Sequence, residues 1–242
     1  PLPDQRADVL LPEGDDRAPV LVHLHGGGLE GGSRHDDAGL HARLRAAGVA
    51  VVSPDYRLYP QARFPEFVED AAACVAMVRR ELPGRPLLVG GSSAGAYLAM
   101  MLRFDRRWLA VAGLASADVA GWLFDGGQPT THFNVLSERG LDPARVVVDD
   151  AAPLFHVDAT TEPAPTLVVL AEDDIPGRRE QSDLLLATLA RLVPGDDTRF
   201  EVIEGQQHSE YLRDDSAGQD RFVDLALDLV ARAVATGSAD PS

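Results

Sequence analysis

A serine that could act as a nucleophile lies at the centre of residues 91–95, which read Gly-Ser-Ser-Ala-Gly. Between a strand and a helix, this pattern bends the chain sharply, and its small residues leave the central hydroxyl exposed on strained backbone. Ser92 is the competing nucleophile, but only Ser93 has a glycine two positions before it and two positions after it. We therefore predict that Ser93 is the nucleophile, and the alternative interpretation is a simple glycine turn.

A second group of residues could stabilise negative charge on an oxygen atom. Gly27 and Gly28 belong to a run of three glycines that follows His25 and the apolar residues 19–24. Glycines let backbone N–H groups approach an oxyanion without interference from Cβ. We predict that Gly27, Gly28 and Ala94 donate to this oxyanion and that His25 pins the loop by hydrogen bonding. A phosphate-binding loop is the alternative, but no lysine follows the glycines.

Serine is a poor nucleophile until a base removes its proton. His208 is the best candidate because it follows the last predicted strand, residues 199–203, in a loop at the expected end of the sheet. His132 and His156 also follow Ser93 in the chain, but they fall in an irregular segment and are weaker candidates.

The base needs a carboxylate that holds its tautomer and stabilises the imidazolium. Residues 166–170 form an apolar strand that leads into Glu172, Asp173 and Asp174, so three carboxylates compete for this role. In each case the chain order is serine, then acid, then histidine, which is the order expected for an α/β-hydrolase fold.

The elements that must position these residues alternate between apolar strands and helical segments, which predicts an α/β fold with a mostly parallel central sheet flanked by helices. We expect a single domain over residues 1–242. The predicted strands are residues 7–11, 19–24, 49–53, 86–90, 109–114, 166–170 and 199–203, the last at an edge of the sheet. The predicted helices are residues 36–47, 67–82, 94–103, 178–192 and 221–235, and a polar, frayed tail follows at 236–242.

Residues 118–161 interrupt this alternation and are predicted to form a small cap insert over a pocket, because a long segment without strands in a compact domain is often functional. Its aromatic side chains Trp122, Phe124 and Phe133 are candidates to contact the leaving group of a substrate. A plain core role is the alternative for each of them.

Composition limits the partners and cofactors that we expect. The net charge of −16 repels phosphate backbones and anionic lipids, so we predict no nucleic-acid partner and no membrane association. Cys74 is the single cysteine and excludes an intrachain disulfide. His23 and His25 alternate on one side of a strand, but two histidines do not make a metal site, so we expect neither a metal nor an organic cofactor. No signal peptide is recognisable after Pro1, and the expected location is cytoplasmic.

The motifs resemble the α/β-hydrolase esterases related to hormone-sensitive lipase and bacterial acetyl esterases. The stretches that carry the resemblance are residues 25–28, 55–58, 91–95, 171–174 and 205–208. The region around Ser93 is also similar to feruloyl and acetylxylan esterases and to kynurenine formamidase.

The resemblance has implications for individual residues. The acid motif of these esterases resembles Ala-Glu-x-Asp, which selects Asp174 over Asp173. Their Tyr-Arg-Leu segment is a structural marker, so Tyr56 and Arg57 are expected to support the scaffold.

We therefore predict a serine carboxylesterase that hydrolyses small-molecule esters with short, acetyl-like acyl groups through an acyl-enzyme intermediate. Only a short stretch precedes the apolar residues 19–24, so we expect the cap helices that these esterases carry there to be absent, and therefore expect a short acyl group. An amidase or formamidase is the first alternative, and a non-catalytic ligand-binding protein with the same fold is the second. The oligomeric state stays open.

Overall fold

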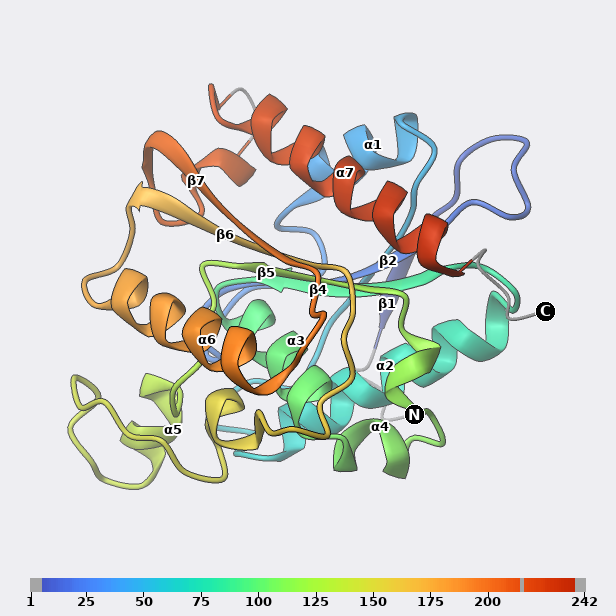
Figure 1. Cartoon of the computed structure of the whole chain (residues 1–242). Coiled ribbons are helices and arrows are strands. Elements are labelled where there is room, and N and C mark those ends of the chain that lie inside the picture. The colour runs from blue at the N-terminus through green and yellow to red at the C-terminus, as the bar shows by residue number, and fades with distance from the viewer. Residues whose placement is uncertain (1–5, 214–215, 238–242) are drawn as a thin grey trace.

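The computed structural model describes residues 6–213 and 216–237, and these residues build one seven-stranded sheet (Figure 1). Its spatial order is β1-β3-β2-β4-β5-β6-β7. Neighbouring strands run parallel except β1, which pairs antiparallel with β3. The strands are β1 (Ala7–Leu10), β2 (Val20–Leu24), β3 (Ala50–Pro54), β4 (Leu87–Ser92), β5 (Gly121–Asp125), β6 (Thr166–Asp173) and β7 (Thr198–Gln207).

The helices cover both faces of the sheet, as Figure 1 shows with α1 and α7 above it and α2, α3 and α6 below it. Such coverage explains why β2 to β5 read as near-continuous apolar runs, since every residue of these strands is buried. The helices are α1 (Ala38–Ala46), α2 (Glu66–Glu81), α3 (Ala94–Phe104), α4 (Arg107–Val111), α5 (Phe133–Glu138), α6 (Arg178–Leu192) and α7 (Gln219–Gly237). The predicted mostly parallel sheet flanked by helices is confirmed.

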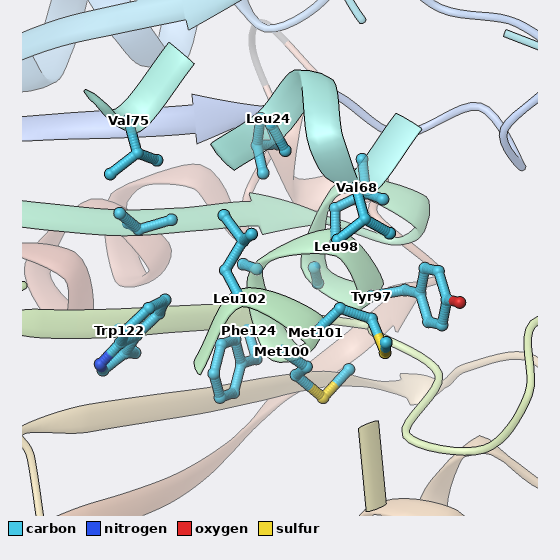
Figure 2. Close-up of a cluster of buried hydrophobic side chains, with 14 of the residues drawn as sticks. Leu24, Val68, Val75, Tyr97, Leu98, Met100, Met101, Leu102, Trp122 and Phe124 are labelled. Atoms are coloured by element: carbon cyan, nitrogen blue, oxygen red, sulfur yellow. The ribbon is translucent and has the colours of Figure 1, made fainter. Parts of the chain in front are cut away.

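Each face of the sheet has its own hydrophobic core. One core packs alternate strand residues such as Val22 and Val89 against α2, α3 and α6. The other packs the intervening residues, such as Leu21 and Leu88, against α1 and α7. Helix α3 is buried along its whole length, because it lies directly against the centre of the sheet (Figure 2).

Two of the expected elements differ from the structure. Residues 109–114 were expected to be a strand, but Arg107–Val111 form helix α4, with Leu109 buried and Val111 facing solvent. The strand at this point of the sheet is β5, which lies inside the predicted cap insert 118–161. Its sequence, Gly-Trp-Leu-Phe-Asp, is aromatic because it lies between two cores, and only the segment after Asp125 leaves the sheet.

Most of the remaining boundaries agree with the prediction, but β6 continues to Asp173 and β7 to Gln207, beyond the predicted ends at 170 and 203. Strand β7 forms an edge of the sheet, as its alternating pattern indicated. Helix α7 continues to Gly237, so the first residues of the predicted frayed tail are helical, and residues 238–242 lie outside the described residues. Across the described ranges, no helix has both the length and the apolar character that crossing a bilayer requires.

Because β2, β4, β5, β6 and β7 are parallel, their carboxyl ends all lie at the same end of the sheet. Every predicted polar site residue lies just beyond one of these ends. Side chains that are far apart in the sequence therefore converge there.

Candidate active site

Ser93 occupies a tight turn between β4 and α3. Its backbone has φ 53° and ψ −112°, a conformation that a residue with a side chain adopts only where the surroundings enforce it. The main-chain oxygen of Leu24 requires glycine on both sides of Ser93: a Cβ atom on Gly91 or Gly95 would lie 2.4 Å or 2.0 Å from this oxygen. The Ser93 N–H also donates to the Asp125 carbonyl at 2.6 Å.

The two serines of the turn point in different directions. Ser92 is buried, and its Oγ lies 3.5 Å from Nε2 of His23 inside the core. Ser93 is partly exposed, and its hydroxyl is 2.9 Å from Nε2 of His208. The structure therefore brings Ser93, and not Ser92, to the predicted base.

His208 directly follows β7 and lies between the other two predicted residues. Its Nδ1–H donates to Oδ1 of Asp174 at 2.7 Å, while Nε2 faces Ser93. The imidazole side chain is about one-fifth exposed, at 21%, so a small molecule can reach it. The two other histidines considered for this role are placed elsewhere: His132 is buried, and His156 faces the Asp150 carbonyl and Asp105.

Asp174 is held as a carboxylate that orients His208. Burial alone would raise its pKa, but hydrogen bonds from His208 and from the N–H groups of Ile175 and Ala171 outweigh burial and lower the pKa below its usual value. Asp173 is exposed at the end of β6, and Glu172 instead accepts from the Gly205 N–H. Of the three competing carboxylates, the structure places Asp174 against His208.

The glycine loop after β2 lies beside this turn. Gly27 and Gly28 have φ values of 103° and 66°, and the Gly27 carbonyl closes the loop by accepting the N–H groups of Glu30 and Gly31. Among the described residues, no hydrogen-bond partner is present for the N–H groups of Gly27, Gly28 or Ala94. The three predicted donors are thus available to a ligand.

His25 fixes this loop from beneath. Its Nδ1 lies 2.7 Å from the Gly26 carbonyl, and its ring stacks on Tyr56 with centroids 4.2 Å apart. The Tyr56 hydroxyl donates to the His25 carbonyl at 2.8 Å. Arg57 forms ion pairs with Asp70 and Glu66, so both residues of the Tyr-Arg pair contact the scaffold.

Of the three aromatic residues expected to contact a substrate, only Phe133 lies near the site. A Cβ atom on Gly28 would be 3.0 Å from Cζ of Phe133, which places the ring over the glycine loop. Trp122 and Phe124 lie in β5 and are 1% exposed. Figure 2 shows both in the core beside α3, where a substrate cannot contact them, so the substrate-binding prediction for these two residues is corrected.

Sequence reasoning missed two residues at the end of β5. Gly126 has φ 59°, and a Cβ atom there would lie 2.7 Å from Cε1 of His208. Asp125 is fully buried beneath the site, where its carboxyl accepts the Tyr211 hydroxyl. Burial raises the pKa of Asp125 to about 7. Placing β5 correctly would have revealed both, because they follow its last apolar residue.

Comparisons with known proteins agree with this fold. Residues 21–212 match the model of a protein family that is described as having the alpha/beta hydrolase fold. The chain is 33% identical over 169 residues to an acetyl-hydrolase of Streptomyces hygroscopicus, covering 65% of this chain and 53% of that protein. It is 32% identical over 183 residues to an acetyl esterase of Salmonella schwarzengrund, covering 64% and 55%.

A solved structure extends the likeness over nearly the whole chain. Esterase 2 of Thermogutta terrifontis superposes with a TM-score of 0.78 at 19% identity, covering 98% of this chain and 92% of that one. The chain spans about half the length of the two curated relatives.

Proposed function

The chain belongs to the family with the alpha/beta hydrolase fold, and from this membership we propose that it is a serine carboxylesterase acting on small esters. The observation that carries the proposal is the continuous hydrogen-bonded chain from Ser93 through His208 to Asp174. Ser93 lies beside three N–H groups, those of Gly27, Gly28 and Ala94, that have no partner among the described residues.

In the first step, Nε2 of His208 accepts the hydroxyl proton of Ser93 as the serine oxygen attacks the ester carbonyl carbon. The new imidazolium donates from Nδ1 to Asp174, whose lowered pKa keeps it ionised. The carbonyl oxygen becomes an oxyanion and accepts hydrogen bonds from Gly27, Gly28 and Ala94. Each such donor contributes roughly 100- to 1,000-fold to the rate.

Collapse of this intermediate expels the alcohol, which takes the proton from Nε2 of His208. The acyl group stays on Ser93. Water then donates its proton to His208 and attacks the acyl carbon, and the carboxylic acid leaves as Ser93 regains its proton. The positive end of α3 lies at Ser93 and favours the negative charge in both steps.

Three observations support a short acyl group. The Phe133 ring packs against Gly28 and narrows the space next to the oxyanion donors. The curated relatives carry the names acetyl-hydrolase and acetyl esterase. In addition, the Thermogutta esterase has been solved with propionate and with butyrate bound.

The proposal is tested by measuring the hydrolysis of p-nitrophenyl acetate, butyrate and octanoate by wild type and by Ser93→Ala. We expect rates that fall with chain length and that are lost in the variant. Asp173→Asn is the matched control, because this exposed carboxylate neighbours Asp174 without contacting His208, and it should keep the wild-type rates.

A fluorophosphonate probe gives an independent readout, because only an activated serine becomes labelled. Labelling of wild type but not of Ser93→Ala supports the proposal. Labelling without ester hydrolysis would point to an activated amide as the substrate. Absence of both labelling and hydrolysis would contradict the proposal and favour a binding protein.

A further inference from the structure

Two histidines and an aspartate form a second cluster of polar side chains between β2 and α1, on the face of the sheet that α1 and α7 cover. His23 comes from β2, His41 from α1, and Asp37 is the residue directly before α1. Both imidazoles are buried, with exposures of 0% and 2%, and the Asp37 side chain is 13% exposed. The hydrolytic steps use none of these three residues.

One potential ligand atom from each residue lies close to the other two. Nδ1 of His23 lies 3.0 Å from Nε2 of His41 and 3.6 Å from Oδ2 of Asp37, and all three atoms are within 4.8 Å of one another. In the part of the chain that the structure describes, no other three histidine, cysteine or carboxylate side chains come this close.

Hydrogen bonding within the cluster accounts for only one of these contacts. The two imidazoles are at hydrogen-bond distance, but the 3.6 Å between His23 and Asp37 is too long for a hydrogen bond. Asp37 also stands at the N-cap of α1 without capping it through its side chain. An aspartate at this position ordinarily accepts the first free N–H groups of its helix. Its carboxylate is directed to the histidines instead.

Two of the three spacings match the ligand shell of a small divalent ion, whereas the atoms of Asp37 and His41 are farther apart, within 4.8 Å. Zinc binds imidazole nitrogen and carboxylate oxygen at about 2.0–2.2 Å, so two ligands of a tetrahedral site are about 3.3–3.5 Å apart. The observed 3.0 Å and 3.6 Å lie on either side of that value. Both imidazoles are buried, and a ring nitrogen that gives up its hydrogen bond to the neighbouring ring can offer its lone pair to a metal.

We propose that His23, Asp37 and His41 bind one zinc ion, with water in the fourth position. The ion would join the start of α1 to the end of β2. Nε2 of His23 faces Ser92, the residue before the proposed nucleophile, and this contact would orient the His23 ring. The ion would therefore stabilise the sheet edge behind Ser93 and take no part in the hydrolytic steps.

The test uses tag-free protein that has been treated with a chelator and then titrated with Zn²⁺ or Co²⁺. We expect one equivalent of Zn²⁺ by calorimetry and visible Co²⁺ absorption bands typical of a tetrahedral site. A Zn²⁺ concentration 100 times the Kd should raise the Tm by roughly 5–10 °C.

Three variants locate the site. His41→Gln and Asp37→Asn should each weaken Zn²⁺ binding at least tenfold. Asp37→Asn keeps the side-chain volume at a partly exposed position, so it separates metal binding from folding. His35→Gln is the control, because this exposed histidine lies on the same segment, pairs with Asp8 and should leave binding unchanged.

The absence of saturable Zn²⁺ binding to wild type would overturn the proposal, and so would binding that both Asp37→Asn and His41→Gln leave intact. Neither result tests the proposed esterase function of Ser93, because the titration measures metal binding and not hydrolysis.

Discussion

Replacing Gly126 by alanine probes the position of His208 without removing any polar group. The added Cβ atom would lie 2.7 Å from Cε1 and 3.0 Å from Nδ1 of His208. An ordinary contact begins at 3.4 Å, so the imidazole must retreat by about 0.7 Å (3.4 − 2.7). That movement disturbs both hydrogen bonds of the ring, to Ser93 and to Asp174.

A displacement of about 1 Å in a catalytic geometry costs on the order of 100-fold in rate. We therefore expect kcat of Gly126→Ala to fall roughly 30- to 100-fold, with KM within about threefold of wild type, because the oxyanion loop and Phe133 stay in place. The left-handed backbone of Gly126 adds a cost of about 1 kcal/mol to stability. For a domain of this size, that corresponds to a decrease of roughly 2–4 °C in Tm.

Steady-state kinetics with p-nitrophenyl acetate and a thermal melt measure the two effects separately. Gly140→Ala is the matched control: its φ is 71°, and nothing lies within 4 Å of the added Cβ atom. It should show the decrease in Tm without the decrease in kcat. A Gly126→Ala enzyme with wild-type kcat would refute the idea that contact with this glycine positions His208.

Three further predictions concern other residues. Asp174→Asn should lower kcat about 10⁴-fold at neutral pH, whereas Asp173→Asn should not, as p-nitrophenyl acetate kinetics would reveal; equal losses would contradict the assignment. Burial raises the pKa of Asp125 to about 7. Between pH 4 and 7 the folded state therefore holds a proton that the unfolded state has released. The free energy of unfolding should then fall as pH rises, by at most about 1.4 kcal/mol per pH unit. In urea unfolding, the free energy of unfolding of Asp125→Asn should increase relative to that of wild type as pH rises. A difference between the two that stays constant with pH would contradict the pKa shift. Phe133→Ala should improve kcat/KM for octanoate relative to acetate, whereas Trp122→Ala should leave this ratio unchanged and destabilise the fold by about 3–5 kcal/mol in denaturant melts.

Local sequence was sufficient to predict much of the fold and the turn around Ser93. A sharp turn needs small residues at fixed spacing, and Gly91 and Gly95 are required by contacts that the spacing implies. His208 and Asp174 could be selected because each follows an apolar strand of the same parallel sheet, so the direction of the strands brings them to one edge.

Other features depend on contacts that the one-dimensional pattern does not contain. Apolar residues 109–114 suit either a strand or a short buried helix, and the structure shows helix α4 over Arg107–Val111. Because residues 109–114 were predicted to be the strand at this place in the sheet, the true strand β5 and its Trp122 were assigned to the predicted insert 118–161. Gly126 was missed for the same reason. The approach of α1 to β2 brings Asp37 and His41 to His23, and no spacing in the sequence indicates it.

The turn at Ser93 is shaped by atoms other than the serine hydroxyl. The Leu24 carbonyl, the two flanking glycines and the bond from the Ser93 N–H to Asp125 all persist when the side chain is shortened to alanine. Ser93→Ala should therefore remain an intact receptor that retains an ester without consuming it. Immobilised on a resin and exposed to a cell extract, it would enrich its own cognate compound for identification by mass spectrometry. Removing the nucleophile thus leaves a binding site whose bound compound identifies the natural substrate.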